Sequence, residues 1–238
     1  MLDPSDLAHR IATVHEAIAS AATASGRAPE AITLVAVTKT HPVETVRAAL
    51  AAGLKDLGEN RVQEMVEKAA AYPGGAAGGE HRWHLIGALQ RNKARDAALT
   101  ADLVHGVDSL RLAEALGARA ADAGRTLPAL VQVNISGEAT KSGVPPDAAH
   151  DLMTAVAGMP GLRLTGVMGI AAPARDNADA EQIVRPAFRR LRALFDTYTG
   201  PGREHLTVVS MGMSDDLRLA IEEGSTLVRV GTALFGSR

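Results

Sequence analysis

The chain has 238 residues, a length that suits one large α/β domain or two small ones. Its net charge of −2 argues against a general nucleic-acid binder, and the absence of cysteine excludes disulfides and thiolate metal sites. Hydrophobic residues make up 46% of the chain but aromatic residues only 3%, so the core must be built from Ala, Val, Leu and Ile.

The first residues show no targeting signal. Asp3, Asp6 and Arg10 place charges where a signal peptide would need an apolar core. No stretch reaches the ~18 apolar residues that a membrane helix requires. We therefore expect a soluble cytoplasmic protein that binds neither membrane nor nucleic acid.

Helical and strand patterns alternate from the start of the chain. Residues 5–25 form a predicted helix, because apolar positions recur at three- and four-residue spacing and Gly26 follows as a stop signal. The apolar run 32–38 is typical of a strand buried on both faces, and Pro42 begins the next helix. The other elements predicted up to residue 134 are strands 55–58, 83–86, 103–107 and 127–134, and helices 61–71, 92–100 and 109–124.

The glycine-rich segment 73–80 is a predicted flexible loop. A domain boundary could lie there, but neither flank looks complete alone. We therefore predict a single domain that spans residues 1–238.

The alternation continues to the end of the chain. Pro186 is predicted to kink the long helix 178–198 or to mark its true start. Ser109 and Ser214 are predicted helix caps. The remaining predicted elements are strands 164–168, 206–210 and 227–230, and helices 146–157, 178–198 and 214–223.

Eight short strands with helices between nearly all of them predict an α/β fold, a single (β/α)8 TIM barrel. The length is close to the ~250 residues typical of that fold, and the helix at 5–25 would be an extra element. The alternative is a doubly wound open sheet. No G-x-G-x-x-G motif follows the first strand, which weakens the dinucleotide-binding version of that alternative.

Lys39 stands at the carboxyl end of the first strand, where α/β barrels place their chemistry. An amine held there is partly desolvated, so its pKa should fall and it becomes a usable nucleophile. The alternative is a lysine that simply extends to water from a strand end.

The ends of the last two strands predict a phosphate site. Barrels often bind phosphate with the loops after strands seven and eight, and here these loops carry Ser210, Gly231 and Thr232. Glycine lets backbone N–H groups approach a phosphate, and hydroxyls add donors. The alternative is that the glycines only serve tight turns. Asp215 and Asp216 would repel a phosphate, so it should lie nearer Ser210 and Gly231-Thr232 than the helix begun by Ser214.

A lysine and a phosphate site on one rim favour a phosphorylated aldehyde held as an imine. Pyridoxal 5′-phosphate (PLP) is the leading candidate. Arg229, at the end of the last strand, could be the partner of its pyridine nitrogen. The alternative for Arg229 is a salt bridge with Glu59.

Histidines give weaker signals. His81 and His84 flank Trp83 on a predicted strand and so face opposite sides, which argues against a metal pair. We expect His84 to make a structural hydrogen bond, although a side chain on the inner face of the strand could also approach a cofactor. No metal site and no catalytic Ser-His-Asp arrangement is predicted.

Several segments in series resemble a known family. They are VAVTKTHP, GENRVQE, WHLIGALQRNK, VNISGEATKSGV, GVMGIAAP, SMGMSDD and GSTLVRVGTALFG, and they cover the chain from about residue 32 to residue 237. They resemble the YggS/PROSC family of PLP-binding proteins, the pyridoxal phosphate homeostasis proteins. The resemblance implies a barrel similar to the N-terminal domain of alanine racemase, without that enzyme's second domain.

The resemblance also implies roles for particular residues. Lys39 would carry PLP covalently as a Schiff base, and Arg229 would meet the pyridine nitrogen. Phosphate would be bound by Ser210, Gly231 and Thr232, with Asn60 and His84 near the cofactor. Three positions depart from the family pattern: His41, Arg61 and Ala88.

Two functions compete. One is a PLP carrier that acts in intracellular PLP homeostasis and supply, with PLP-dependent apo-enzymes as candidate recipients. The other is an amino-acid racemase or related PLP enzyme. Racemisation needs a second acid or base opposite Lys39, and the only tyrosines, Tyr72 and Tyr198, lie at predicted helix ends away from the rim. We therefore expect a carrier without relevant racemase activity. The sequence does not fix the oligomeric state, and a monomer is the expectation.

Overall fold

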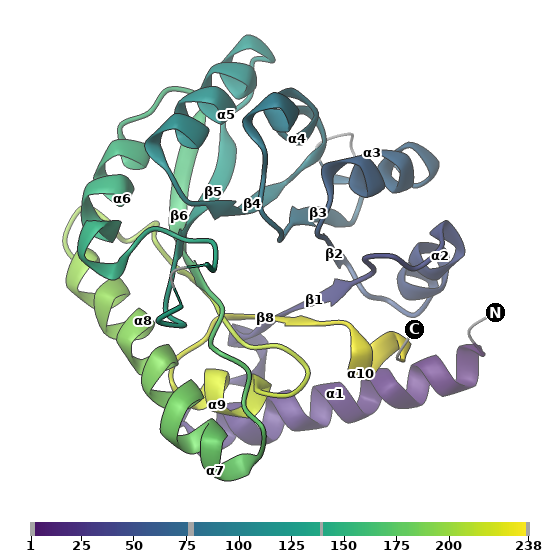
Figure 1. Ribbon diagram of the computed structural model, residues 1–238. Helices are drawn as coiled ribbons and strands as arrows, with labels where there is room; N and C mark the ends of the chain where they lie inside the picture. Colours follow the sequence, from purple (N-terminus) through teal and green to yellow (C-terminus); the bar gives the residue numbers. More distant parts are fainter. Residues whose placement is uncertain (1–2, 76–78, 139, 237–238) are drawn as a thin grey trace.

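Eight parallel strands close into a barrel in the order β1 to β8 in the computed structural model (Figure 1). Each strand pairs with its neighbours in the chain, and β8 closes against β1 through pairs such as Arg229 with Val35. The predicted barrel is confirmed, and the open sheet is excluded. The structure describes residues 3–75, 79–138 and 140–236. The strands are β1 Thr33–Val37, β2 Asp56–Glu59, β3 Arg82–Leu85, β4 Leu103–Val107, β5 Leu127–Val133, β6 Leu162–Gly169, β7 Val208–Ser210 and β8 Leu227–Val230.

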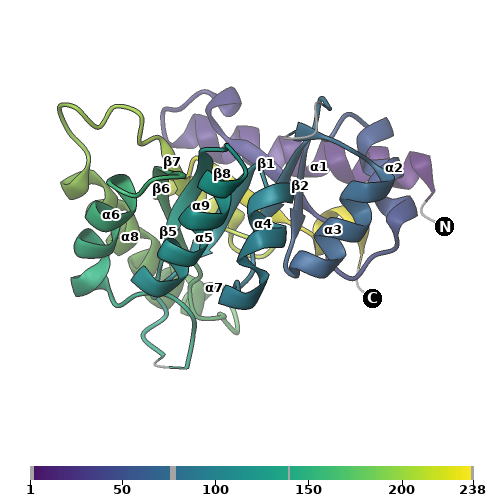
Figure 2. The same ribbon diagram turned by 90° about the horizontal axis from the view of Figure 1, so that it is seen from above.

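Helices surround the barrel (Figures 1 and 2). They are α1 Pro4–Ala24, α2 Val43–Ala51, α3 Val62–Ala71, α4 Ala94–Thr100, α5 Leu110–Asp122, α6 Ala149–Ala157, α7 Asn177–Asp179, α8 Arg185–Tyr198, α9 Leu217–Glu222 and α10 Thr232–Phe235. Short 3₁₀ turns cover Pro29–Ala31, Arg91–Lys93 and Pro146–Ala148. Within the described ranges, no helix has the length and apolar character needed to cross a membrane.

The extra helix α1 packs against α9 and α10 on the outside of the barrel (Figure 1). Asp3 caps it by accepting a hydrogen bond from the Ser5 N–H at 2.9 Å. Its buried face includes Leu7, Val14 and Ile18, which follow the helical spacing of the sequence. This helix therefore supports the last two βα units from outside.

Two of three predicted helix starts are observed, and the third differs. Ser109 occupies the N-cap position of α5, but its side chain makes no capping hydrogen bond. The helix α9 begins at Leu217, because residues 214–216 form a turn in which Asp216 accepts the Met213 N–H. Pro186 lies in the first turn of α8, directly after a π-helical segment at residues 180–184. Proline lacks an N–H, so the regular ladder of hydrogen bonds cannot continue through it.

The core has two parts. A large apolar layer fills the space between the strands and the helices. A small second cluster fills the barrel lumen and consists of Val35, Leu103, Leu130, Met168 and Leu227. Side chains of a strand alternate between these two layers. The loop after α3, which includes the predicted flexible segment, leads into β3 of the same barrel; residues 76–78 lie outside the described residues.

Candidate functional site

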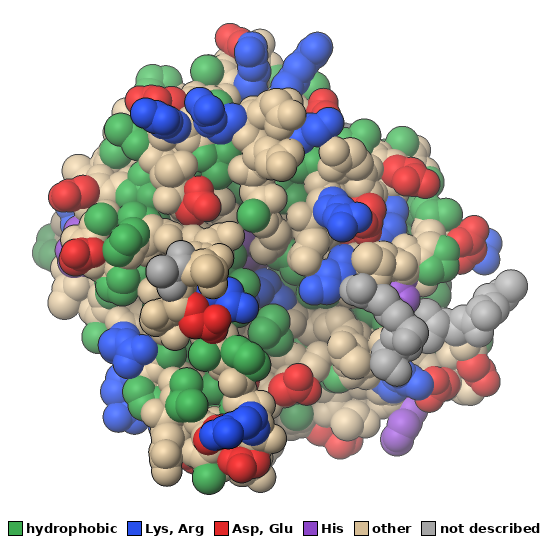
Figure 3. Space-filling model, in the orientation of Figure 1, with side chains coloured by type: hydrophobic (Ala, Val, Ile, Leu, Met, Phe, Trp, Pro, Cys, Tyr) green, Lys and Arg blue, Asp and Glu red, His purple; other side chains and the backbone are tan. Residues whose placement is uncertain are grey.

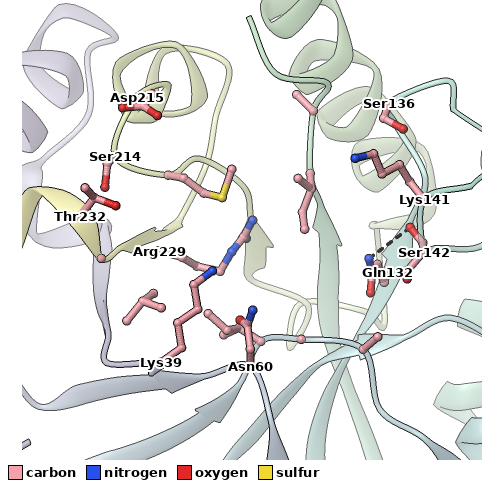
Figure 4. Close-up of a pocket in the computed structure, with 18 of the residues that line it drawn as sticks. Lys39, Asn60, Gln132, Ser136, Lys141, Ser142, Ser214, Asp215, Arg229 and Thr232 are labelled. Carbon is pink, nitrogen blue, oxygen red and sulfur yellow. Dashed lines mark hydrogen bonds between the residues drawn. The ribbon is translucent and has the colours of Figure 1, made fainter. Parts of the chain in front are cut away.

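A pocket of ≈ 670 Å³ opens at the carboxyl ends of the strands. Lys and Arg side chains gather around the central hollow of this face (Figure 3). Five of the predicted site residues line the pocket: Lys39, Asn60, Arg229, Gly231 and Thr232. Lys39 and Arg229 extend toward one another across its floor (Figure 4). The structure thus brings together residues from the first, second and last strands.

Two side chains of α3 hold the backbone on either side of Lys39. Lys68 Nζ donates to the Thr38 carbonyl at 2.7 Å, and Glu64 Oε2 accepts from the Thr40 N–H at 2.8 Å. Glu64 and Lys68 lie one helical turn apart, so they share a face of α3. Thr40 has φ of 60°, a left-handed conformation that is strained for a β-branched residue. The two hydrogen bonds keep the strained turn in place and direct Lys39 into the pocket.

A buried ion pair lies behind this turn. Lys68 Nζ is 2.6 Å from Glu59 Oε1, which also accepts from the Thr38 hydroxyl at 2.6 Å. Burial raises the pKa of Glu59, although the hydrogen bonds from Lys68 and Thr38 oppose this shift. Glu59 is therefore committed to Lys68, and the alternative salt bridge between Glu59 and Arg229 is not formed.

Hydroxyl groups and glycine form the wall between the ends of β7 and β8. Ser214 and Thr232 point into this part of the pocket beside Asp215 (Figure 4). Ser214 Oγ accepts from the Ala233 N–H at 3.3 Å and so links the two loops. At Gly231, an added Cβ would lie 3.3 Å from the Val37 carbonyl oxygen, so a side chain would crowd the backbone of β1. Short donors and an open backbone make this wall suited to an anion.

The opposite wall comes from β5 and the loop that follows it. It presents Gln132, Ser136, Lys141 and Ser142 (Figure 4). Gln132 Nε2 donates to the Ser142 carbonyl at 3.2 Å. Its Oε1 is buried and has no hydrogen-bond partner among the described residues. A buried acceptor without a partner is costly unless a ligand or water satisfies it.

Ser210 and His84 do not line the pocket. The Ser210 hydroxyl lies in the barrel lumen, where it accepts from Arg229 Nη1 at 2.6 Å and meets His105 Nδ1 at 3.0 Å. The expectation that Ser210 binds phosphate is therefore revised, because its hydroxyl is already engaged below the pocket floor. His84 lies deeper still, between Asp56 and His105, and makes the structural hydrogen bonds expected of it.

Arg229 is held at the base of the pocket. Besides Ser210, it donates from Nη2 to the Gly169 carbonyl at 3.2 Å. Burial lowers its pKa to about 10, and attraction to Asp216 opposes the shift. The guanidinium therefore remains charged at neutral pH.

The neighbouring positions complete the lining. Asn60 is fixed next to Gly87, where any Cβ would come within 2.3 Å of the Asn60 carbonyl oxygen. His41 and Ala88 both line the pocket, and the His41 ring packs on Phe235 at 5.6 Å. Arg61 is exposed. In the part of the chain that the structure describes, no cluster of three or more His, Asp or Glu side chains could hold a metal ion.

Comparison with known proteins identifies the family. The sequence model described as alanine racemase, N-terminal domain, matches residues 9–238. The pyridoxal phosphate homeostasis protein of Pseudomonas aeruginosa is 45% identical over 235 residues, which are 98% of this chain and 96% of that protein. Its counterpart in Escherichia coli K12 is 42% identical over 234 residues, 98% of this chain and 97% of that protein. The chain belongs to the pyridoxal phosphate homeostasis protein family.

A solved member of the same family has a similar structure. PipY, the COG0325 family member of Synechococcus elongatus PCC7942, in its structure with PLP bound, superposes with a TM-score of 0.79 at 34% identity. The match covers 97% of this chain and all of that one. The resemblance that the sequence motifs indicate is therefore confirmed.

The sequence analysis of the present chain did not assign some residues of the pocket and of the barrel lumen. Ser214 is predicted as a helix cap in the loop after the seventh strand but not as a phosphate ligand, although this loop brings it to the pocket. Gln132 could have been found from the two-residue alternation, because it follows the lumen residue Leu130 on β5. The lumen residue His105, which does not line the pocket, follows Leu103 in the same way on β4.

Proposed function

We propose that this protein binds PLP in the pocket, carries it covalently on Lys39, and acts in PLP homeostasis and supply to PLP-dependent apo-enzymes. The observation that carries the proposal is the juxtaposition of Lys39 and Arg229 beside a wall of hydroxyls and glycine. The names of its relatives and the PLP-bound structure of PipY support it. All residues that line the pocket belong to the same barrel, so we propose a single domain, and a monomer stays the expectation.

The residues present fit PLP. Lys39 Nζ would condense with the aldehyde and release water. Arg229 would donate to the pyridine nitrogen, and Ser214, Gly231 and Thr232 would hold the phosphate in place of the originally predicted Ser210. Gln132, on the opposite wall, contributes a buried acceptor, Oε1, that has no hydrogen-bond partner among the described residues. When bound, PLP supplies a reactive aldehyde and an electron-withdrawing ring.

The covalent assignment is tested by trapping. Purified protein is incubated with PLP, the adduct is reduced with borohydride, and the modified lysine is mapped by mass spectrometry. We expect modification of Lys39. A label confined to Lys93 or Lys141 would contradict the assignment.

The phosphate assignment is tested with Thr232→Val, which keeps the shape of the side chain and removes its donor. PLP affinity is expected to fall by about 5- to 150-fold, because an unpaired phosphate oxygen costs roughly 1–3 kcal/mol. Pyridoxal, which lacks the phosphate, is the control ligand and should bind both proteins alike. Equal PLP affinity of the two proteins, measured by absorption titration, would count against this wall as the phosphate site.

We propose further that the protein has no physiologically relevant racemase activity. Of the two tyrosines, Tyr72 ends α3, and Tyr198 bonds Thr154 at 3.2 Å on the outside of the barrel. Neither lines the pocket, so the second proton donor or acceptor that racemisation needs is not supplied by tyrosine. A positioned acid or base is worth about 10²–10⁴-fold in rate. An arginine partner also disfavours a protonated pyridine nitrogen.

The racemase alternative is tested by incubating PLP-loaded protein with alanine or serine and separating the enantiomers by chiral chromatography. Turnover should stay far below the common enzymatic range of about 1–10³ s⁻¹. Turnover within that range, lost in Lys39→Ala, would overturn the carrier assignment.

A further inference from the structure

A continuous chain of four hydrogen bonds between side chains, called the file below, runs through the barrel lumen from Asp56 to Arg229. His84 Nε2 lies 2.8 Å from Asp56 Oδ1, and His84 Nδ1 lies 3.0 Å from His105 Nε2. His105 Nδ1 lies 3.0 Å from Ser210 Oγ, which is 2.6 Å from Arg229 Nη1. All five residues are buried. The file crosses four strands besides β8 and joins residues that are far apart in the sequence.

The two ends of the file lie at different ends of the barrel. Arg229 lines the pocket at the carboxyl ends of the strands. Asp56 is the first residue of β2 and pairs with Arg82, the first residue of β3, at 2.7 Å. The Arg82 side chain is 57% exposed, so this end meets solvent at the opposite face.

The chemistry of the ends sets one direction for every hydrogen bond. The Asp56 carboxylate only accepts, so His84 must donate from Nε2 and, when neutral, accept at Nδ1. His105 then donates from Nε2 and accepts at Nδ1 from the Ser210 hydroxyl. The Ser210 oxygen is left to accept from Arg229, which only donates. In this arrangement each of the four hydrogen bonds has one donor and one acceptor.

The protonation states agree with this order. Burial raises the pKa of Asp56, but hydrogen bonds and charges from His84 and Arg82 outweigh it and keep the carboxyl ionised. The pKa of His105 lies well below its ordinary value because of burial and the nearby His84 and Arg229. Asp216 is the other charged group near Arg229. His105 is therefore neutral near pH 7 and carries one ring proton, as the file requires.

We propose that Asp56, His84, His105 and Ser210 are positioning residues that fix Arg229 as the hydrogen-bond donor to the ring of bound PLP. The inference rests on the proposed function, since it adds a support for the ring partner assigned there. With Nη1 committed to Ser210 and Nη2 to Gly169, the guanidinium has one orientation in the pocket. A residue at the far end of the barrel thus determines the donor that a ligand meets.

The order of the file is tested first without ligand. The protein is labelled with ¹⁵N-histidine, and the ring nitrogens of His84 and His105 are assigned by NMR near pH 7. We expect a proton on Nε2 of each ring and none on Nδ1, as the order of the hydrogen bonds requires. In Asp56→Asn the obligatory acceptor is replaced by an amide that can donate or accept, so His105, two links away, should lose its single tautomer. A proton on Nδ1 of either ring in the wild type, or an unchanged His105 in Asp56→Asn, would overturn the proposal.

The link to the pocket is tested with Ser210→Ala and its matched control Ser225→Ala. Ser225 is equally buried beside β7 and β8, but its hydroxyl bonds only main-chain carbonyl groups. Ser210→Ala should shift the absorption band of bound PLP and weaken its affinity by about tenfold. Ser225→Ala should leave both unchanged even if it lowers the melting temperature.

PLP binding by the serine variants and the histidine NMR measurement together distinguish a failure of this inference from a failure of the proposed function. Identical bands and affinities in Ser210→Ala and Ser225→Ala would overturn the positioning role. If the wild-type protein did not bind PLP, the proposed function would fail, while the NMR measurement would still decide whether the file is ordered.

Discussion

Replacing Lys39 by alanine is expected to abolish covalent attachment of PLP and its characteristic absorption band. The fold should survive, because Lys39 extends into the pocket and is not part of either apolar cluster. Loss of a contact with a charged group alone costs roughly 1.5–3 kcal/mol, about 10- to 150-fold in affinity, and loss of the covalent bond adds to it. Absorption titration and circular dichroism measure binding and folding separately.

Lys141→Ala is the matched control for this experiment. It removes the other lysine that lines the pocket, on the wall opposite Thr232 (Figure 4). This variant should still be trapped at Lys39 by borohydride. A Lys39→Ala protein that keeps the band, or a Lys141→Ala protein that loses it, would contradict the assignment of Lys39 as the lysine that carries PLP.

Replacing Lys68 by methionine is expected to produce the largest loss of stability. The change leaves the buried Glu59 carboxylate without its cation and leaves the Thr38 carbonyl with one donor, the His41 N–H, instead of two. Breaking a buried ion pair by removing one partner typically costs about 3–5 kcal/mol, which corresponds to a fall of roughly 6–20 °C in melting temperature at this chain length. Urea and thermal unfolding measure the effect.

The stability loss in Lys68→Met should depend on pH. A carboxyl group whose pKa is raised by folding contributes stability below its unfolded pKa and loses that contribution as the pH rises through the folded pKa. Burial already raises the pKa of Glu59 above its ordinary 4.5, and removing Lys68 raises it further. The defect should therefore be largest at neutral pH and shrink in acid.

A double variant provides the control. Adding Glu59→Gln to Lys68→Met removes the uncompensated charge, so much of the stability at neutral pH should return. A double variant no more stable than Lys68→Met would show that packing, rather than the buried charge, causes the loss.

The sequence predicted the barrel because each strand is a local signal. Runs such as residues 103–107 and 227–230 are mostly apolar, with one interior polar residue each, and their observed bounds match the predicted ones. The predicted starts of helices were less accurate where the geometry of the preceding loop determines the first residue of the helix. The turn at residues 214–216 depends on a contact between Asp216 and the Met213 backbone that no periodicity reveals.

The pocket was partly predictable for the same reason. Lys39 and Thr232 directly follow strands, so topology alone assigns them to one rim. Ser210 also ends a strand, yet its hydroxyl is bonded to Arg229 and His105 in the lumen and does not line the pocket. Arg229 donates to Ser210 of β7 and to the Gly169 carbonyl of β6, and such contacts between separate parts of the chain leave no mark in the local sequence.

Closure of β8 against β1 has a consequence for how the protein is made. Lys39 follows the first strand and Arg229 belongs to the last, and these strands pair through Val35 and Arg229. Contacts between the two ends of a chain carry a high entropic cost and form late in folding. During synthesis, the ribosome must release nearly the whole chain before both side chains can face one ligand. The site is therefore complete only when β8 has paired with β1, and a truncated chain that lacks β8 would expose its lysine without the arginine opposite.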